Sequence, residues 1–277
     1  MNCPAKSVLV LTDIEGITGV YEKAQCKPYT PEWKEARHLI TADLSAAIAG
    51  LKDAGVEEIH VRDMHGTGFN ILPRFMPEEG VFLKQGHRWY PVPLLGEIPE
   101  ADLAIMIGWH AAADQVDGFS PHMFHRDIDW VRIDNRAVTE VEIMAAVLAE
   151  HKIPVAMVTA DLTACRRISA NLPWAKTVTI PKKEIGSKKT ADIHKSIRDN
   201  AREAAASGEP FPCFKTGPFL MESSIRGEIR KGYFPSGRAV LTTLLRQSVF
   251  KGIPAGMIPS ILNGYRWLGF WQNIMNG

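Results

Sequence analysis

The chain has 277 residues, a formal net charge of +1, 45% hydrophobic residues and 23% charged residues. This is the profile of an ordinary soluble globular protein, long enough for one large α/β domain or for one domain with a smaller appendage. A net charge this close to zero gives no strong field that would favour nucleic acid or a membrane surface as partner. No stretch approaches the roughly 20 uncharged apolar residues of a membrane span.

The four cysteines are scattered along the chain, without a CxxC pair and without a short secreted framework. The N-terminal region shows no signal peptide, because the apolar run of residues 8–11 is short and meets Asp13 almost at once. Both features favour a reducing compartment. We therefore expect a cytoplasmic protein, and we expect no thiolate zinc site.

The first predicted strand, residues 8–11, is continuously apolar, which is typical of a strand buried on both faces of a parallel sheet. It leads into Asp13 and Glu15, which lie two residues apart and so point to the same side of an extended segment. Ligands of open α/β sheets collect at the carboxyl ends of the strands. Two anions held this close repel unless a cation lies between them. The pair indicates either a metal site or a turn with two solvated acids.

Two later strands end in a similar way. Residues 57–66 form a short predicted strand that ends near His65, and residues 101–110 form an apolar strand that delivers His110. Neighbouring strands lie about 4.8 Å apart, so if the three strands adjoin, their imidazoles and carboxylates converge. A mixed set of imidazoles and carboxylates suits zinc or another borderline divalent ion.

The segments between these strands predict the connections of the sheet. Residues 31–54 have helical spacing and end at a glycine, so the first two strands should be parallel. Residues 69–96 are rich in proline, glycine and aromatic residues, an excursion long enough to wall a pocket, and we interpret His87 within it as structural. Residues 129–142 read as a hairpin that leads into a helix. A basic run that includes Lys182 is interpreted as a solvated face.

The pattern changes near residue 210, where an extended segment and a helical segment precede an aromatic-rich tail, residues 264–277. Such a tail must be buried or cover a partner. We expect an α/β fold, a three-layer and mostly parallel sheet with helices on both faces, forming a metal-binding catalytic domain over residues 1–209. Residues 210–277 should form a smaller C-terminal α+β subdomain that shapes the pocket and supports oligomerisation.

Three further polar residues are candidates for the same site. Glu140 opens a predicted helix, where an acid is either a metal ligand or a side chain favoured by the helix dipole. His122 and His125 lie in a polar loop and are either general acid–base groups or surface residues. The chain has no nucleophile elbow, P-loop, dinucleotide fingerprint or HExxH motif.

Taken in order, these motifs resemble the zinc-dependent D-aminopeptidases of the DppA type, peptidase family M55. The resemblance covers most of the chain and is strongest up to about residue 165. It is carried by D-x-E-G-I-[ST]-G at residues 13–19, D-x-H at 63–65, G-[WY]-H-A at 108–111, a glycine-led loop with histidine at 118–122, and I-[ND]-[ND]-R-x-V-x-E at 133–140.

The resemblance implies two zinc ions per subunit, a catalytic role for His122 ahead of His125, and assembly into a ring-like homo-oligomer. We expect Asp13, which emerges first and most centrally, to bridge the two ions, and we expect Asp63 and Asp161 either to orient imidazoles or to cap helices. The ligands that the resemblance implies are Asp13, Glu15, His65, His110 and Glu140.

The sequence thus predicts a dinuclear zinc aminopeptidase that acts on short peptides or amino-acid amides, plausibly with a D-residue at the N-terminus. One alternative is a magnesium-dependent phosphohydrolase with Asp13 as nucleophile, which would leave His65 and His110 without a role. The other is a non-catalytic metal-binding module.

Overall fold

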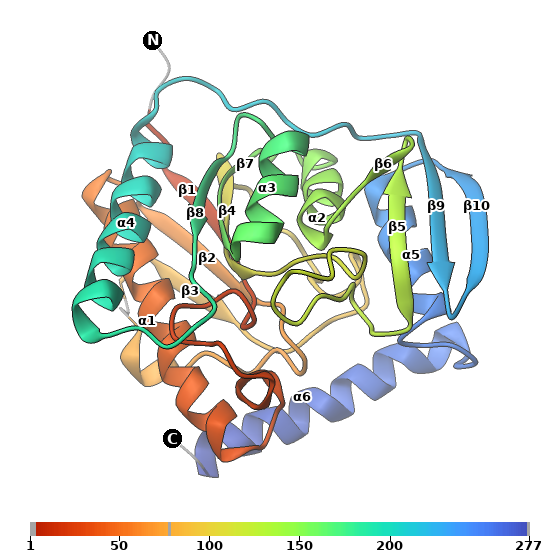
Figure 1. Cartoon of the computed structure of the whole chain (residues 1–277), viewed down its shortest axis with the longest axis horizontal. Coiled ribbons are helices and arrows are strands. Elements are labelled where there is room, and N and C mark those ends of the chain that lie inside the picture. Colours follow the sequence, from red (N-terminus) through yellow and green to blue (C-terminus); the bar gives the residue numbers. More distant parts are fainter. Residues whose placement is uncertain (1–3, 77–78, 276–277) are drawn as a thin grey trace.

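The computed structural model describes residues 4–76 and 79–275, and its centre is a six-stranded sheet with helices on both faces (Figure 1). The strand order is β3-β2-β1-β4-β7-β8, and all neighbouring strands are parallel. The predicted three-layer, mostly parallel α/β fold is confirmed. The strands are β1 (Ser7–Thr12), β2 (Glu58–Asp63), β3 (Val81–Lys84), β4 (Leu103–Trp109), β7 (Val155–Ala160) and β8 (Lys176–Thr179).

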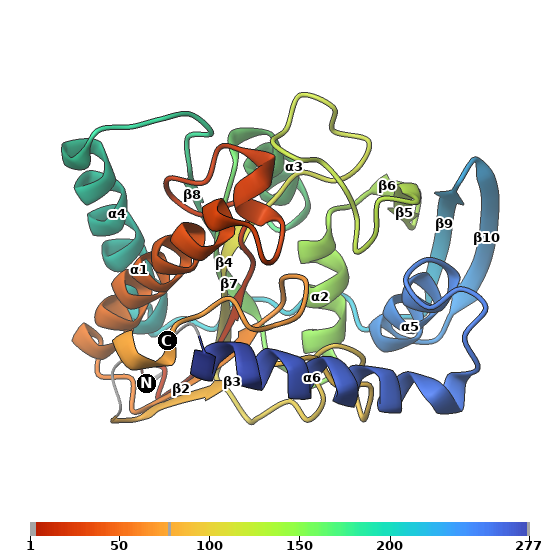
Figure 2. The ribbon, with the colours of Figure 1, turned by 90° about the horizontal axis from the view of Figure 1, so that it is seen from below.

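Alternate side chains of the strands feed two separate cores. Val8 and Val10 of β1 pack in the core beneath helices α1 (Pro31–Asp53) and α4 (Ser187–Ala206). Leu9 and Leu11 pack in the core shared with α2 (Glu140–Ala149) and α3 (Leu162–Asn171). Figure 2 shows these two helical layers on opposite sides of the sheet. Because β1 is buried on both faces, its sequence is apolar throughout.

Helix α1 follows the prediction for residues 31–54 closely. Thr30 caps its N-terminus by accepting a hydrogen bond from the Trp33 amide at 3.0 Å, and Pro31 takes the first position, where no amide is needed. The helix ends before Gly55, whose φ of 84° lies in the left-handed region. The crossover leaves β1 and β2 parallel, as predicted.

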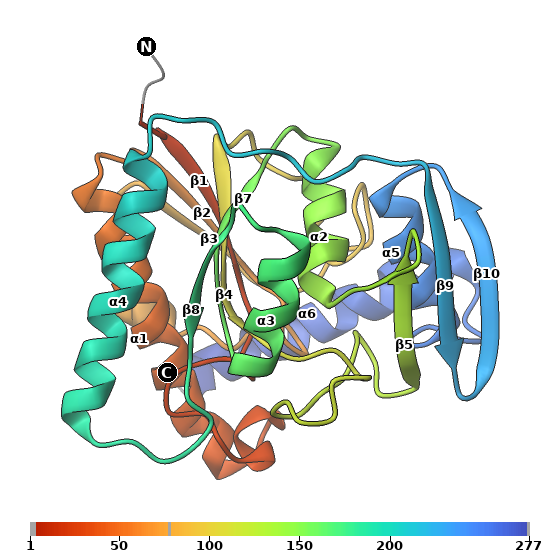
Figure 3. The same ribbon diagram turned by 45° about the horizontal axis from the view of Figure 1, so that its top comes forward.

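A second, antiparallel sheet has the order β10-β9-β5-β6 (Figure 3). Asp134 and Asn135 turn the predicted hairpin with φ angles of 50° and 66°. The sheet contains strands that precede residue 210 and strands that follow it in the chain. The predicted division into residues 1–209 and 210–277 therefore stays a prediction. The strands are β5 (Ile128–Ile133), β6 (Arg136–Ala137), β9 (Phe219–Ile225) and β10 (Glu228–Phe234).

The chain closes with helices α5 (Gly237–Gln247) and α6 (Ile258–Met275). Helix α6 runs along one side of the molecule, from the neighbourhood of α5 towards α1 (Figure 2). Within it Leu262 is buried, whereas Trp267 and Leu268 are exposed. Leu262 lies before the predicted tail of residues 264–277, and within that tail the side chains of Tyr265, Trp267 and Leu268 are exposed. That the tail covers a partner stays a prediction, and its last part lies outside the described side chains. The 3-10 helices are Lys23–Cys26, Pro73–Phe75 and Ala255–Met257.

In the part of the chain that the structure describes, every helix is too short or too polar to cross a lipid bilayer.

Candidate metal centre

The three strands with polar ends are neighbours in the central sheet, in the order β2-β1-β4. Because parallel strands end at one edge of a sheet, the segments that follow them lie side by side. This edge brings Asp13 and Glu15 after β1 together with His65 after β2 and His110 after β4. The predicted convergence of the four side chains is confirmed.

A first group of possible metal ligands consists of Asp13, Glu15 and His65. One ligand atom from each of the three lies within 4.8 Å of the others. His65 Nδ1 is 3.1 Å from Asp13 Oδ1 and 3.0 Å from Glu15 Oε2. The two carboxylates are almost fully buried, Asp13 at 5% exposure and Glu15 at 3%.

A second group consists of His110, His122 and Glu140, again with ligand atoms within 4.8 Å of one another. His110 Nε2 lies 3.4 Å from Glu140 Oε1 and also 3.4 Å from Asp13 Oδ2. Asp13 therefore contacts a histidine of each group, one through each carboxylate oxygen. All six predicted site residues are brought together by the fold.

The donor set fits a divalent transition metal. It consists of imidazoles and carboxylates without thiolates, the combination that zinc accepts in hydrolytic sites. Buried Glu15 Oε2 and Asp13 Oδ1 lie 3.0 and 3.1 Å from the same atom, His65 Nδ1, so a single N–H faces two carboxylate oxygens. A cation between the two acids would give these oxygens a further partner and relieve their repulsion.

Two glycines let the site segments approach each other. The Gly16 amide donates a hydrogen bond to the Gly108 carbonyl at 2.7 Å, and a Cβ on Gly16 would lie 2.0 Å from the Trp109 carbonyl oxygen. Gly108 has a φ of 83°, and a Cβ there would lie 2.2 Å from the Asp13 carbonyl oxygen. No other residue type fits this crossing. The local irregularity in the pairing of β4 with β7 lies at the same point, just before His110.

Backbone carbonyls fix the orientation of the three imidazoles. The second ring nitrogen of each histidine lies within hydrogen-bond distance of a carbonyl oxygen: His65 Nε2 at 2.7 Å from Cys26, His110 Nδ1 at 2.9 Å from Ala111, and His122 Nδ1 at 2.8 Å from Ser120. When the nitrogen next to the carbonyl carries the proton and donates it to that carbonyl, the other nitrogen of the same ring faces the carboxylates. This is the usual arrangement behind metal-binding histidines.

Asp63 and Asp161 do not orient these rings, so that option for them is wrong. Asp63 accepts hydrogen bonds from the backbone and side chain of Asn70, and thereby shapes the loop that follows His65. Asp161 caps α3 through the Thr163 and Ala164 amides, which was the alternative prediction.

Burial and charge shift the pKa values of the acids in opposite directions. Burial and the nearby Glu15 charge raise the pKa of Asp13 to about 7. Burial alone would also raise the pKa of Glu15, but the charge of His65 and its hydrogen bond hold it well below the usual range. The acidic pair therefore shares its negative charge unequally when no cation is bound.

The imidazoles respond to the same acids. Burial opposes the charged form of His110, yet the hydrogen bond and charge of Glu140 raise its pKa to about 10. His65 likewise has a pKa well above its usual value, because the charge of Glu15 outweighs its burial. Burial and the neighbouring His110 charge lower the pKa of His122, so this ring is neutral at pH 7.

The two acids at the start of α2 have separate tasks. Glu142 forms a capping box with Thr139, whose amide donates to Glu142 Oε2 at 2.8 Å. Glu140, two residues earlier, turns instead towards His110. Both acids lie in the first turn of α2, but only Glu142 takes part in its cap, whereas Glu140 also accepts a hydrogen bond from the Phe124 amide beside the site.

His122 and His125 also separate in the structure. The His122 ring stacks on His110 and faces the cavity beside the two groups. The side chain of His125 is 35% exposed, and its Nδ1 lies 3.4 Å from Asp127. Of the two loop histidines, His122 is the one that the fold brings to the two groups of possible metal ligands.

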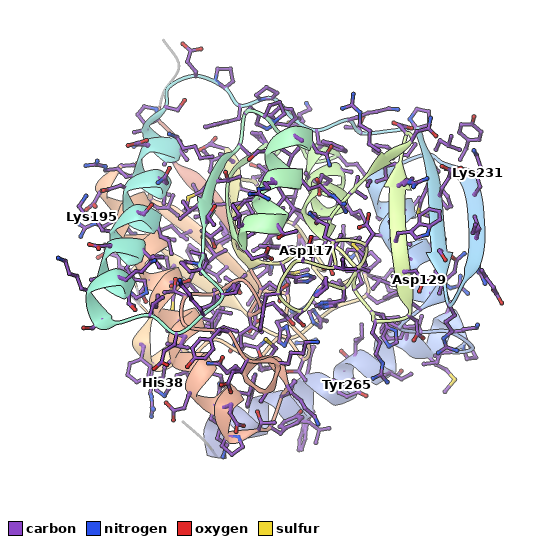
Figure 4. All side chains as sticks on the ribbon, viewed as in Figure 1. His38, Asp117, Asp129, Lys195, Lys231 and Tyr265 are labelled. Carbon is purple, nitrogen blue, oxygen red and sulfur yellow. The ribbon has the colours of Figure 1, made fainter. Side chains whose placement is uncertain are left out.

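A cavity of about 360 Å³ opens over both groups. As predicted, the excursion of residues 69–96 contributes to its wall, through His87 and Leu94. The sequence did not single out the side chains from α5 and α6 that complete it, among them Leu245 and Tyr265; Figure 4 shows Tyr265 on α6. Apolar residues of this kind look like ordinary core positions in a sequence.

The solvated-face interpretation is wrong for Lys182. Its Nζ donates hydrogen bonds to the carbonyls of Ile17 (2.8 Å) and Val20 (3.2 Å), and burial lowers its pKa to about 8. Lys182 therefore ties down the loop that follows Glu15. Lys183, Lys188 and Lys189 are exposed, as expected.

The fold and the two buried groups define an α/β protein with a candidate metal site at the strand ends. The model of the M55 peptidase family, described as D-aminopeptidase, matches residues 7–229, so the chain belongs to this family. The resemblance is confirmed, and with it the class of an aminopeptidase, a hydrolase of peptide or amide bonds.

One solved structure supports the fold independently. It is described as "Zn-dependent D-aminopeptidase DppA from Bacillus subtilis, a self-compartmentalizing protease", and it superposes with a TM-score of 0.77 at 17% sequence identity. The match covers 90% of this chain and 100% of the DppA chain. No curated protein sequence matches this chain.

Proposed function

We propose that this chain is a dinuclear zinc aminopeptidase that hydrolyses the N-terminal amide bond of short peptides or amino-acid amides. The contact of Asp13 with a histidine of each ligand group carries the proposal. Three carboxylates supply three negative charges, which nearly balance two Zn²⁺ ions and one hydroxide. A single metal ion would need neither this many ligands nor a carboxylate shared by two groups.

In this proposal Glu15 and His65 would hold one ion, His110 and Glu140 would hold the other, and Asp13 would be shared between the two groups. When bound, such a pair of ions polarises the scissile carbonyl and lowers the pKa of the attacking water. The buried carboxylates and the carbonyl-anchored imidazoles hold the ligand atoms in place before substrate arrives, so little reorganisation is needed.

His122 is the proposed proton carrier. Its low pKa keeps the ring neutral, and the Nδ1–H···O=C contact with Ser120 leaves Nε2 as an acceptor. Nε2 takes a proton from the water whose oxygen bonds to the carbonyl carbon. The same proton passes to the amine nitrogen as the carbon–nitrogen bond breaks, so the products are a free amino acid and a shortened peptide or an amine.

A preference for D-residues and assembly into a ring-like homo-oligomer are part of the proposal. Both are supported by the family description and by the description of DppA as self-compartmentalizing. The exposed Tyr265, Trp267 and Leu268 on α6 offer apolar surface for such an assembly.

We also propose a cytoplasmic location, since Cys26, Cys165 and Cys213 are free thiols. We further propose that residues 1–209 form a metal-binding domain and that residues 210–277 form a region that shapes the pocket and supports oligomerisation. This division is supported by the contribution of Leu245, Leu262 and Tyr265 to the cavity.

The phosphohydrolase alternative accounts less well for the site. A nucleophilic Asp13 with magnesium would prefer an all-oxygen environment, yet His65 and His110 both lie against that carboxylate. A paired assay on amino-acid p-nitroanilides and p-nitrophenyl phosphate, with metal analysis of the same preparation, separates the alternatives. Zinc with amide hydrolysis supports the proposal; phosphate hydrolysis alone, or metal without either activity, contradicts it.

A further inference from the structure

The cavity over the metal groups has two unlike walls. Its ionisable lining residues are His87 and five members of the groups described above, Asp13, His65, His110, His122 and Glu140. A set of apolar lining residues, called here the apolar wall, is assembled from separate parts of the chain outside these groups. Its members are Leu94, Leu245, Val249, Phe250 and Leu262.

Most of the apolar wall is packed into the fold. Leu245 is 1% exposed, and Phe250 and Leu262 are each 7% exposed. The Phe250 ring packs edge-on against Trp89 with centroids 5.2 Å apart, and the Phe250 amide donates to the Leu245 carbonyl at 2.9 Å. The wall is thus formed before any ligand arrives, as in most small-molecule sites.

The size of the cavity bears on what fills it. Its volume of about 360 Å³ lies within the range of small-molecule sites, roughly 300–1,000 Å³. The single methyl group of an alanine amide would leave the apolar wall in contact with water. A ligand with a larger apolar side chain removes that water.

We propose that this wall is a subsite for a large apolar side chain on the N-terminal residue of the substrate, of the size of leucine, methionine or phenylalanine. The proposal rests on the proposed function. The scissile carbonyl must lie at the ligand groups, and a leaving peptide of variable length must extend towards solvent. The N-terminal side chain then has the apolar wall to pack against.

Specificity constants of the zinc-loaded protein test this subsite. The substrates are the p-nitroanilides of alanine, leucine and phenylalanine, each as the D and the L enantiomer. We expect kcat/KM for leucine or phenylalanine to exceed that for alanine by about 100-fold in the preferred enantiomer, since each methylene in an apolar pocket is worth about 10-fold or more. A preference for alanine, or equal values, overturns the inference.

Variants that fill the subsite with a larger side chain provide a second test. Val249 is 38% exposed, so the larger side chain of Val249→Phe has room to fold, and Leu262→Trp fills the cavity more completely. Either variant should reduce the phenylalanine-to-alanine ratio by about 10-fold or more while leaving the zinc content unchanged. Ser260→Trp, at an exposed position of the same helix outside the cavity lining, is the matched control and should keep the ratio. Unchanged ratios in both filled variants contradict the inference.

Binding of phenylalaninol and alaninol, which lack a scissile amide, separates this inference from the proposed function. Isothermal titration calorimetry should give a dissociation constant for phenylalaninol at least about 10-fold below that for alaninol. Val249→Phe should remove the difference. If no amide is hydrolysed but this binding pattern appears, the subsite stands and the aminopeptidase proposal fails. Equal binding of the two alcohols overturns the subsite even if amides are cleaved.

Discussion

The imidazole rings of His110 and His122 stack on each other, with centroids 4.0 Å apart and planes only 6° from parallel. In the metal-free protein His110, which lies between the acids Asp13 and Glu140, is the charged partner, and its charge helps to lower the pKa of His122. The pair therefore combines a ring suited to hold a metal with a ring suited to carry a proton.

This relationship predicts the outcome of removing His122. His122→Ala should keep its zinc and lower kcat for an amino-acid p-nitroanilide by about 10²- to 10⁴-fold, the usual range for a general acid–base group. His125→Ala, which removes a partly exposed ring paired with Asp127, should have a milder effect. The reverse ranking, or loss of zinc from His122→Ala, would show that His122 is not the proton carrier.

Removing Asp13 should empty the site. Because Asp13 contacts a histidine of each ligand group, Asp13→Ala should lose both ions or most of their affinity, measured by atomic emission after dialysis. Asp117→Ala, in the exposed loop shown in Figure 4, is the control and should keep them. Full metal content and activity in Asp13→Ala would exclude the bridging role.

Zinc binding to the metal-free protein should release protons. The raised pKa values leave His65 and His110 protonated at pH 7, and Asp13, with a pKa of about 7, is half protonated. Metal ligands must give up these protons, so we expect release of about two or more per chain at pH 7 and weaker zinc binding as the pH falls below 7. Titration calorimetry in buffers of different ionisation enthalpy measures the number. Binding without proton release would contradict the ligand set.

The close approach of the Gly16 and Gly108 segments should tolerate no side chain at either glycine. Gly108→Ala places a Cβ against the Asp13 carbonyl and forces a left-handed φ on alanine, so it should lower the free energy of unfolding by about 3 kcal/mol and also reduce zinc content. Gly55→Ala has a similar φ but no atom within 4 Å, so it should cost only about 1 kcal/mol. Denaturant unfolding measures both. Equal losses would mean that the crossing is not tightly packed.

The C-terminal helix should support self-association. Deletion from Gly264 removes the exposed Tyr265, Trp267 and Leu268 and should give a smaller species by light scattering, with the metal site at least partly retained. Burying two aromatic rings contributes several kcal/mol, at about 25 cal/mol per Å². A wild-type protein that is strictly monomeric at micromolar concentration would rule out the oligomer.

The sequence predicted the parts of the site that follow from topology. Residues 8–11 show a strand buried on both faces, and side chains that follow parallel strands gather at one edge regardless of loop detail. That is why Asp13, His65 and His110 could be grouped before their distances were known. Gly55 similarly marked the C-terminal end of α1 through local chemistry.

Features made by loop conformation could not be predicted in this way. The carbonyls of Cys26, Ala111 and Ser120 that orient the rings leave no pattern in the sequence, because every residue has a carbonyl. Lys182 looks like its solvated neighbours until the fold places its amine against two loop carbonyls. The apolar wall of the cavity has the same composition as a core, so only the structure separates the two.

Zinc reconstitution tests the central claim most directly. The protein is stripped with a chelator, zinc is added in fractions of an equivalent, and hydrolysis of an amino-acid p-nitroanilide is measured at each step. We predict that activity is absent without zinc and reaches its plateau at two equivalents per chain, as expected for two coupled metal positions. A plateau at one equivalent would contradict the dinuclear site, and activity that does not depend on zinc would contradict the account as a whole.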